Sequence, residues 1–140
     1  MDLDDIQAKI PHRPPMLLLD AVLELSPDCI VCEKTFRLDE FFHQGHYPGN
    51  PIIPGFMLCE AAAQAGAVLA ASSQPAEGVP LLTRASEIKF KQVVRPGDTI
   101  RIEATVNERL GGAMYFSARV TKAGRLAASL TFAVKLQTPE

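Results

Sequence analysis

Two residues that stand fourteen positions apart, His46 and Glu60, carry side chains that could perform acid–base chemistry together. His46 lies in the stretch GHYPGNPIIPG, a predicted loop that Pro48, Pro51 and Pro54 make stiff. A stiff loop that holds the one side chain titrating near neutral pH is typical of a general base. The alternative is a loop histidine that only hydrogen-bonds the backbone and helps to shape a turn.

Glu60 belongs to the apolar run FMLCEAAAQAGAVLAASS, which with Gly55 predicts a buried helix over residues 55–73. Burial favours the neutral form of a carboxyl group, so we expect a raised pKa and a proton to donate at neutral pH. Gln64 follows one turn later on the same side and could hold the carboxyl group. Two alternatives stay open for Glu60: a solvent-exposed position at the edge of the helix, and a structural acid paired with an arginine.

Gly55 opens the predicted helix directly after Pro54. The first amide groups of a helix lack internal partners and lie at the positive end of its dipole. The Gly55 amide could therefore stabilise a polarised carbonyl oxygen, as in an oxyanion hole. The competing interpretation is that Pro-Gly only turns the chain into the helix.

The composition excludes several classes of protein. A chain of 140 residues with 47% hydrophobic and 21% charged residues is expected to form one domain over 1–140 with a real core. A net charge of -2 argues against a nucleic-acid binder. The chain has no glycine-rich phosphate-binding motif, so its sequence does not indicate a nucleotide cofactor.

The cysteines indicate neither a metal site nor a disulfide framework. Cys29 and Cys32 have the spacing of a zinc ligand pair, but no second pair follows at a suitable distance. On a strand, positions three apart point to opposite faces, so these thiols and Cys59 are expected to fill the core. An odd number of cysteines and an N-terminus without a leader pattern predict a cytoplasmic protein. The helix over 55–73 is expected to be too short, once Gln74-Pro75 ends it, to insert into a membrane.

The remaining elements must position the two candidate residues. A short helix is expected over 2–9, with Asp2 as its cap. Strands are expected over 16–25, 29–38, 81–94, 99–107, 113–121 and 126–136, mostly joined by turns. Only the helix over 55–73 can cover the sheet, so we predict an α+β fold in which an antiparallel sheet of about six strands wraps around one long central helix. Open edges and apolar surface predict a dimer.

Four basic residues cluster late in the chain: Arg84, Lys89, Lys91 and Arg95. A solvated sheet edge is the commoner meaning of such a cluster. The second interpretation is a landing patch for an acidic partner.

Four runs in order, PHRPPMLLLD at 11–20, GHYPGNPIIPG at 45–55, EAAAQ at 60–64 and KFKQVVRPGD at 89–98, resemble the FabZ-type 3-hydroxyacyl-[acyl-carrier-protein] dehydratases. These are hotdog-fold enzymes of bacterial fatty acid synthesis. The resemblance spans nearly the whole chain, and its most specific part is the histidine loop followed by a glutamate five residues after its last glycine.

The resemblance implies a hotdog dimer, often assembled as a trimer of dimers, that acts on acyl carrier protein without a cofactor. It implies that His46 removes the C2 proton of a 3-hydroxyacyl thioester while Glu60 of the opposite subunit protonates the departing C3 hydroxyl group, giving a trans-2-enoyl product. It also implies that the Gly55 amide binds the thioester carbonyl, and it suggests a cis His46–Tyr47 peptide bond.

Two stretches depart from the family pattern and leave the acyl length and the pathway open. One is DEFFHQGH at 39–46, which brings in His43; the other is Arg84, Ala85 and Ser86 before Lys89. Two other functions compete with the dehydratase. A hotdog acyl thioesterase uses a helix acid to activate water and does not generally require a histidine such as His46. A non-catalytic acyl-binding subunit has no need for both His46 and Glu60.

Overall fold

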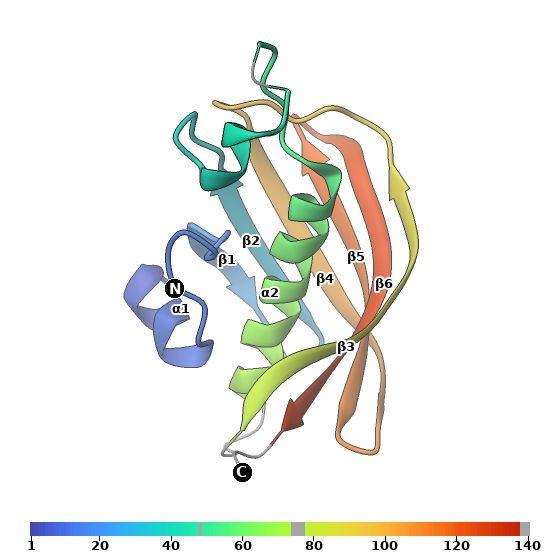
Figure 1. Ribbon diagram of the computed structural model, residues 1–140. Helices are drawn as coiled ribbons and strands as arrows, with labels where there is room; N and C mark the ends of the chain where they lie inside the picture. The colour runs from blue at the N-terminus through green and yellow to red at the C-terminus, as the bar shows by residue number, and fades with distance from the viewer. Residues whose placement is uncertain (48, 74–77, 138–140) are drawn as a thin grey trace.

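The computed structural model describes residues 1–47, 49–73 and 78–137, so Pro48 and the helix end expected at Gln74-Pro75 lie outside the described residues. The described chain forms α1 (Leu3–Lys9), β1 (Ala21–Leu25), β2 (Cys29–Thr35), the 3-10 helix η1 (Phe41–Gln44), α2 (Gly55–Ser73), β3 (Val79–Phe90), β4 (Thr99–Leu110), β5 (Ala113–Lys122) and β6 (Arg125–Gln137). The six strands form one antiparallel sheet in the order β1-β2-β4-β5-β6-β3. The sheet curves around α2 (Figure 1), which confirms the predicted arrangement of one sheet and one long helix.

α2 is the core helix of the domain and has the bounds that its apolar run predicted. A side chain at Gly66 would collide with the sheet, since a Cβ there would lie 2.5 Å from the ring of Phe132. That ring stacks on Phe116 with centroids 5.0 Å apart, so the helix and the sheet meet closely at this point. α2 is long and apolar enough to cross a membrane by length and composition, but 61% of it is buried inside the protein.

The strands follow the period-two pattern where one face is buried. In β4 the alternating residues Ile100, Ile102 and Ala104 are buried beneath α2, and the residues between them are exposed. The strand expected from residue 16 is wrong over residues 16–20, because β1 begins only at Ala21. Residues 16–18 instead use their backbone groups to bind a side chain of α2, as described below.

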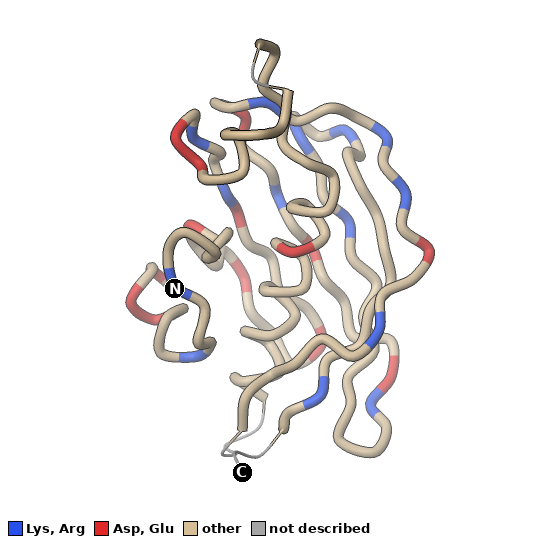
Figure 2. The backbone as a smooth tube through the Cα atoms, in the orientation of Figure 1, with Lys and Arg blue, Asp and Glu red and all other residues tan. Residues whose placement is uncertain are grey.

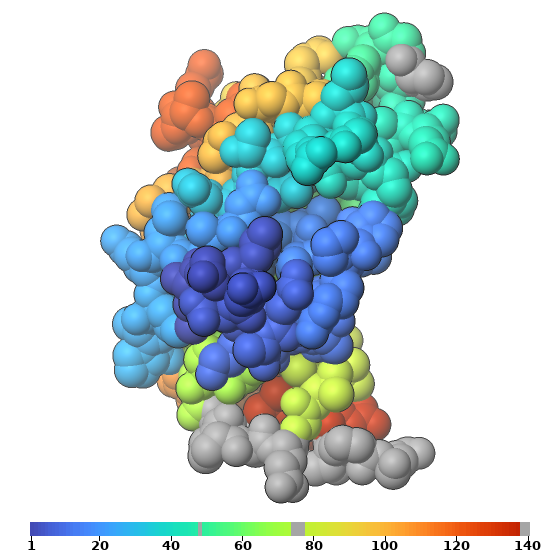
Figure 3. Space-filling model, turned by 90° about the vertical axis from the view of Figure 1, so that its left-hand side faces the viewer, coloured from blue at the N-terminus to red at the C-terminus, as the bar shows by residue number. Residues whose placement is uncertain are grey.

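The N-terminal segment covers one side of the molecule (Figure 3). Asp2 caps α1 by accepting a hydrogen bond from the Asp5 amide at 3.0 Å, and Ile6 is fully buried. Beyond the helix, the Arg13 guanidinium donates to the carbonyl oxygens of Gln7, Ile10 and His12. These three bonds hold the chain in place where it leaves α1.

β3 forms one end of the sheet and pairs only with β6 among the described strands. Two irregularities interrupt this pairing, at Leu82/Arg84 and at Ser86/Lys89, and Glu87 within the second has a φ of 52°. Large apolar side chains are exposed along this edge and beside it: Val79, Leu81, Leu82, Phe90 and Phe56. The edge is therefore both unpaired and apolar in a single chain.

Candidate active site

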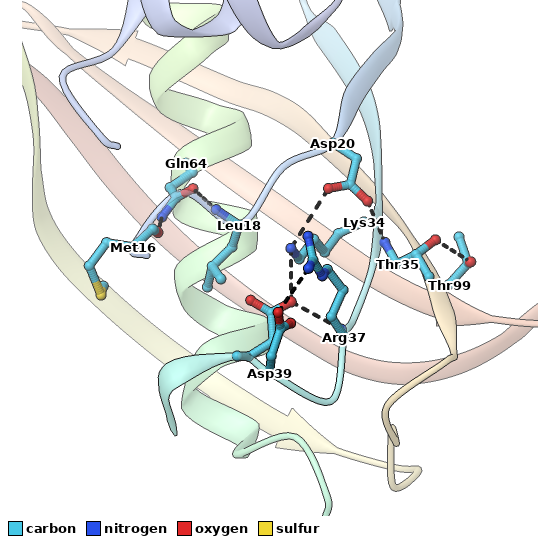
Figure 4. Close-up of polar contacts among 10 residues, drawn as sticks. Met16, Leu18, Asp20, Lys34, Thr35, Arg37, Asp39, Gln64 and Thr99 are labelled. Atoms are coloured by element: carbon cyan, nitrogen blue, oxygen red, sulfur yellow. Dashed lines mark hydrogen bonds and ion pairs between the residues drawn. The ribbon is translucent and has the colours of Figure 1, made fainter. Parts of the chain in front are cut away.

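The carboxyl group of Glu60 is held by Gln64 on the same helix. Gln64 is 1% exposed, and its Oε1 accepts a hydrogen bond from the Leu18 amide at 2.8 Å. Its Nε2 donates to the carbonyl oxygen of Met16 and to Glu60 Oε2, both at 2.7 Å. Figure 4 shows the Gln64 side chain reaching from α2 to the segment of Met16 and Leu18. Since the backbone N–H group of Leu18 can only donate, it must face Gln64 Oε1, and the Nε2 end of the Gln64 amide therefore faces Glu60.

Glu60 itself is less buried in one chain than its apolar helix predicted. Its side chain keeps 29% of its exposure, and it lines a cavity of about 50 Å³ together with Pro80 and Leu82 of β3. The reason is that the cavity borders the open edge strand, which leaves this side of α2 incompletely covered.

A histidine that the sequence did not indicate, His12, lies at this site. Its Nε2 lies 3.8 Å from Glu60 Oε2, and its side chain is 27% exposed. No local pattern could have indicated this contact, because His12 and Glu60 are 48 positions apart and meet only through the long-range attachment of residues 16–18 to Gln64.

His46 occupies a loop that follows η1, away from Glu60 along the chain. Its ring packs edge-on against Tyr47 with centroids 4.7 Å apart, and Tyr47 has a left-handed φ of 50°. The expected cis bond between these two residues is wrong: among the described residues the cis peptide bond joins Pro14 to Pro15. No hydrogen bond or ion pair joins His46 to Glu60 within the described ranges, and His46 is not among the residues that line the Glu60 cavity of one chain.

The base of the His46 loop is anchored by a buried ion pair. Lys34 Nζ lies 3.0 Å from Glu40 Oε2, with the two side chains 8% and 10% exposed, and 3.7 Å from Asp20 Oδ1. Glu40 Oε2 also accepts a hydrogen bond from the Arg37 amide at 3.1 Å. Figure 4 shows Lys34 between Asp20 and the turn that carries Arg37. His43, within η1, packs its ring against Phe42 with centroids 4.9 Å apart.

Gly55 has a packing reason to be glycine. A Cβ at this position would lie 2.8 Å from the ring of Phe90, so no larger residue fits without a shift of that ring. The chain before it is fixed because the Ile53 amide donates to the Val94 carbonyl oxygen at 2.7 Å. Gly55 thus stands at the first turn of α2 as predicted, and its role toward a substrate carbonyl stays a prediction.

The four basic residues of the predicted patch, Arg84, Lys89, Lys91 and Arg95, are all exposed. Figure 2 shows basic positions along β3 and the connection that follows it. Arg95 Nη1 donates to Asn50 Oδ1 at 2.7 Å, which ties this end of the patch to the loop after His46. Exposure alone does not separate a docking patch from a solvated edge.

Two of the three thiols, those of Cys32 and Cys59, fill the core as predicted, whereas Cys29 is only half-buried and lies outside it. Cys32 is fully buried, and burial raises the pKa of its thiol to about 12. Burial also raises the pKa of Cys59, and a protonated thiol is a poor nucleophile and metal ligand. Within the described residues no three His, Cys, Asp or Glu side chains group so as to hold a metal ion.

Comparison with known proteins gives the chain its relatives. Residues 10–131 match the family model of the FabA-like domain. A curated 3-hydroxyacyl-[acyl-carrier-protein] dehydratase FabZ of Streptococcus pyogenes serotype M1 is 43% identical over 136 residues, which cover 95% of this chain and 98% of the relative. The protein of the same name from Chloroflexus aggregans is 44% identical over 138 residues, 96% of each chain.

Solved structures share the fold at much lower identity. The dehydratase heterocomplex ApeI:P from Xenorhabdus doucetiae superposes with a TM-score of 0.81 at 18% identity, over 95% of this chain and 91% of the other. A hypothetical thioesterase with coenzyme A from Streptococcus pneumoniae gives 0.69 at 12% identity, over 98% and 94%. At these identities the likeness shows the hotdog fold alone and does not indicate a function.

Proposed function

Because the chain belongs to the FabA-like family and is a FabZ-type 3-hydroxyacyl-[acyl-carrier-protein] dehydratase of fatty acid biosynthesis, we propose that His46 and Glu60 are the base and the acid of its elimination reaction. The observation that carries this assignment is the state of Glu60. It is the one charged residue of α2, and its carboxyl group is held in place at a cavity that opens toward the sheet edge.

In the proposed reaction His46 accepts the proton from C2 of the 3-hydroxyacyl thioester. The electrons of that bond form the C2–C3 double bond as the C3–oxygen bond breaks, and Glu60 gives its proton to the departing oxygen to form water. Negative charge builds on the thioester carbonyl oxygen as the C2 proton leaves, and the Gly55 amide donates a hydrogen bond to it. Exchange with solvent then returns both residues to their starting protonation states.

The complete site requires two chains in this proposal. His46 neither bonds to Glu60 nor lines its cavity in one chain, whereas that cavity borders the unpaired strand β3 with its exposed apolar residues. A second copy that pairs along β3 covers Glu60 and supplies the opposite His46. Assembly of three such dimers into a hexamer is a further expectation.

The substrate arrives on acyl carrier protein in this proposal, and the basic patch of Arg84, Lys89, Lys91 and Arg95 is its docking surface. Support comes from the exposure of all four cations and from the bond between Arg95 and the loop after His46. We place the protein in the cytoplasm, where its three free cysteines stay reduced.

The test is to incubate the purified protein with 3-hydroxyacyl carrier protein of several chain lengths and to follow products by mass spectrometry. A product lighter by one water is expected, and His46→Ala and Glu60→Gln should each lower the rate by about 10²- to 10⁴-fold. Release of the free acid would instead indicate the thioesterase, and unchanged substrate at every length would indicate the acyl-binding subunit.

A subunit-exchange experiment tests the two-chain site. His46→Ala and Glu60→Gln are mixed under mild denaturation and allowed to reassemble. Half of the dimers are then mixed and have one of two sites intact, so activity should recover to about a quarter of wild type. No recovery from a mixture that has demonstrably exchanged subunits would place both residues in one subunit.

A further inference from the structure

His12 faces the carboxyl group of Glu60 from outside α2, in a position that the assigned chemistry does not yet use. Its Nε2 is 3.8 Å from Glu60 Oε2, the same oxygen that accepts the 2.7 Å hydrogen bond from Gln64 Nε2. The two nitrogens therefore converge on one oxygen. The other oxygen, Oε1, has no hydrogen-bond or ion-pair partner within the described residues.

The surroundings of His12 determine which of its two ring nitrogens can carry the proton. Nδ1 is buried and makes no hydrogen bond to any described group. A proton on a buried, unpaired Nδ1 would leave a donor unsatisfied, so the neutral ring with its proton on Nε2 fits this site best. That tautomer directs an N–H group toward Glu60 Oε2. The 3.8 Å gap exceeds a hydrogen bond, but such bonds are often long before substrate binds.

We propose that His12 is a positioning residue for the dehydration, and that with Gln64 it reserves Glu60 Oε2 as an acceptor. A carboxylic acid has one oxygen that carries the proton and one that accepts. With two donors on Oε2, the proton of Glu60 resides on Oε1, the oxygen that is free to meet the substrate hydroxyl group. When that proton leaves, the same two donors stabilise the carboxylate that remains.

Within one chain, Glu60 and His12 are the two titratable side chains that line this cavity, and in the proposed dimer His46 of the opposite subunit joins them as the base that sets the acidic limb of the pH profile. The remaining lining consists of Gln64 and alanines of α2, with Pro80 and Leu82 of β3 and Val134 of β6. Arg13, the neighbour of His12 in sequence, does not line the cavity, and its guanidinium donates to the carbonyl oxygens of residues 7, 10 and 12. A change at His12 should therefore register on the ionisation of Glu60.

The proposal rests on the assignment of Glu60 as the acid, and a pair of variants tests it. His12→Gln carries an N–H donor where Nε2 stands, whereas His12→Leu keeps a similar volume without a donor. Loss of a hydrogen bond to a charged group should lower kcat of His12→Leu at least about 10-fold, with KM within about 2-fold of wild type. In the kcat–pH profile of this variant, the fall of kcat on the basic side should move to higher pH, because Glu60 loses a donor that favours its ionised form.

His12→Gln should keep most of the wild-type rate and the wild-type basic limb. The proposal is overturned if His12→Leu matches wild type in rate and limb, if its limb does not move, or if His12→Gln is as impaired as His12→Leu. Should His12→Leu fail to fold, His12→Asn, whose shorter side chain withdraws the donor, replaces it. An active Glu60→Gln would overturn the assignment of the acid, while an inactive Glu60→Gln beside an unaffected His12→Leu would overturn only the role of His12.

Discussion

Glu60 and His46, the two halves of the proposed site, are supported in opposite ways. Glu60 lies in the core helix and is fixed by Gln64, which also binds the backbone of residues 16 and 18. His46 lies in a loop whose base is fixed by Lys34 and Glu40, but its own ring contacts only Tyr47 among the aromatic side chains of the described residues.

The difference shows what a single chain can and cannot prepare. The acid is oriented by bonds that the fold itself creates, so it needs little rearrangement when substrate binds. The base is presented on a loop and has no bond to the acid within the chain. In the proposed two-chain site, the second copy along β3 is what brings this base to the acid.

The largest effect should come from breaking the anchor of the histidine loop with Lys34→Met. This change leaves the nearly buried Glu40 without its cation, and the loss of one partner of a buried ion pair should cost about 3 kcal/mol of unfolding free energy. Urea denaturation measures the loss, and kcat should fall because the loop that carries His46 loosens.

The matched control is the double variant Lys34→Met/Glu40→Leu, which removes both charges. It should recover most of the lost stability, since replacing a whole buried pair by apolar groups is often neutral. A double variant as unstable as Lys34→Met would show that Glu40 is not the group left uncompensated.

A smaller effect is expected when the acid's support is broken with Gln64→Met. Methionine fills a similar volume but leaves the Leu18 amide and the Met16 carbonyl oxygen unpaired, which should cost about 2 kcal/mol in a chemical denaturation experiment. Activity should fall through kcat rather than KM, because Glu60 loses its fixed orientation. A stable variant with unchanged kcat would mean that Glu60 is held by other contacts.

The smallest effect should be found at the start of α1, which leads into the segment of His12. The hydrogen bond from the Asp5 backbone amide lowers the pKa of Asp2 below its ordinary value. A lowered pKa in the folded state means that the cap stabilises above the unfolded-state pKa and that this contribution is lost as pH falls through the folded-state pKa. Asp2→Asn should retain the cap and flatten the stability curve in that acidic range, as thermal melts between pH 2 and pH 5 would show, about the range in which a carboxyl group titrates.

The sequence was sufficient for the elements whose evidence is local. A long apolar run predicted α2, because a buried helix needs apolar residues along its length. Alternation of apolar and polar residues predicted β4, because only one face of this strand is buried. The strand prediction failed over 16–20 because residues 17–19 are buried and apolar, as in a strand. The backbone groups of Met16 and Leu18, however, bond to the Gln64 side chain rather than to a neighbouring strand.

The parts of the site that sequence could not provide depend on distant partners. His12 meets Glu60 across 48 positions, and Lys34 meets Glu40 only after the chain turns at Arg37. Neither pairing has a spacing that repeats along the chain. The burial of Glu60 was overestimated for a single chain because an apolar helix indicates what must be covered, not which chain covers it.

The irregular pairing of β3 also bears on how a newly made chain avoids the wrong associations. A long, flat, apolar edge strand would template stacking with any exposed strand. Here the bulge at Ser86/Lys89, with Glu87 at a φ of 52°, bends the edge and places a charge in its middle, and Lys89 adds another. An edge that is bent and charged in this way disfavours the indefinite addition of further strands that leads to fibres.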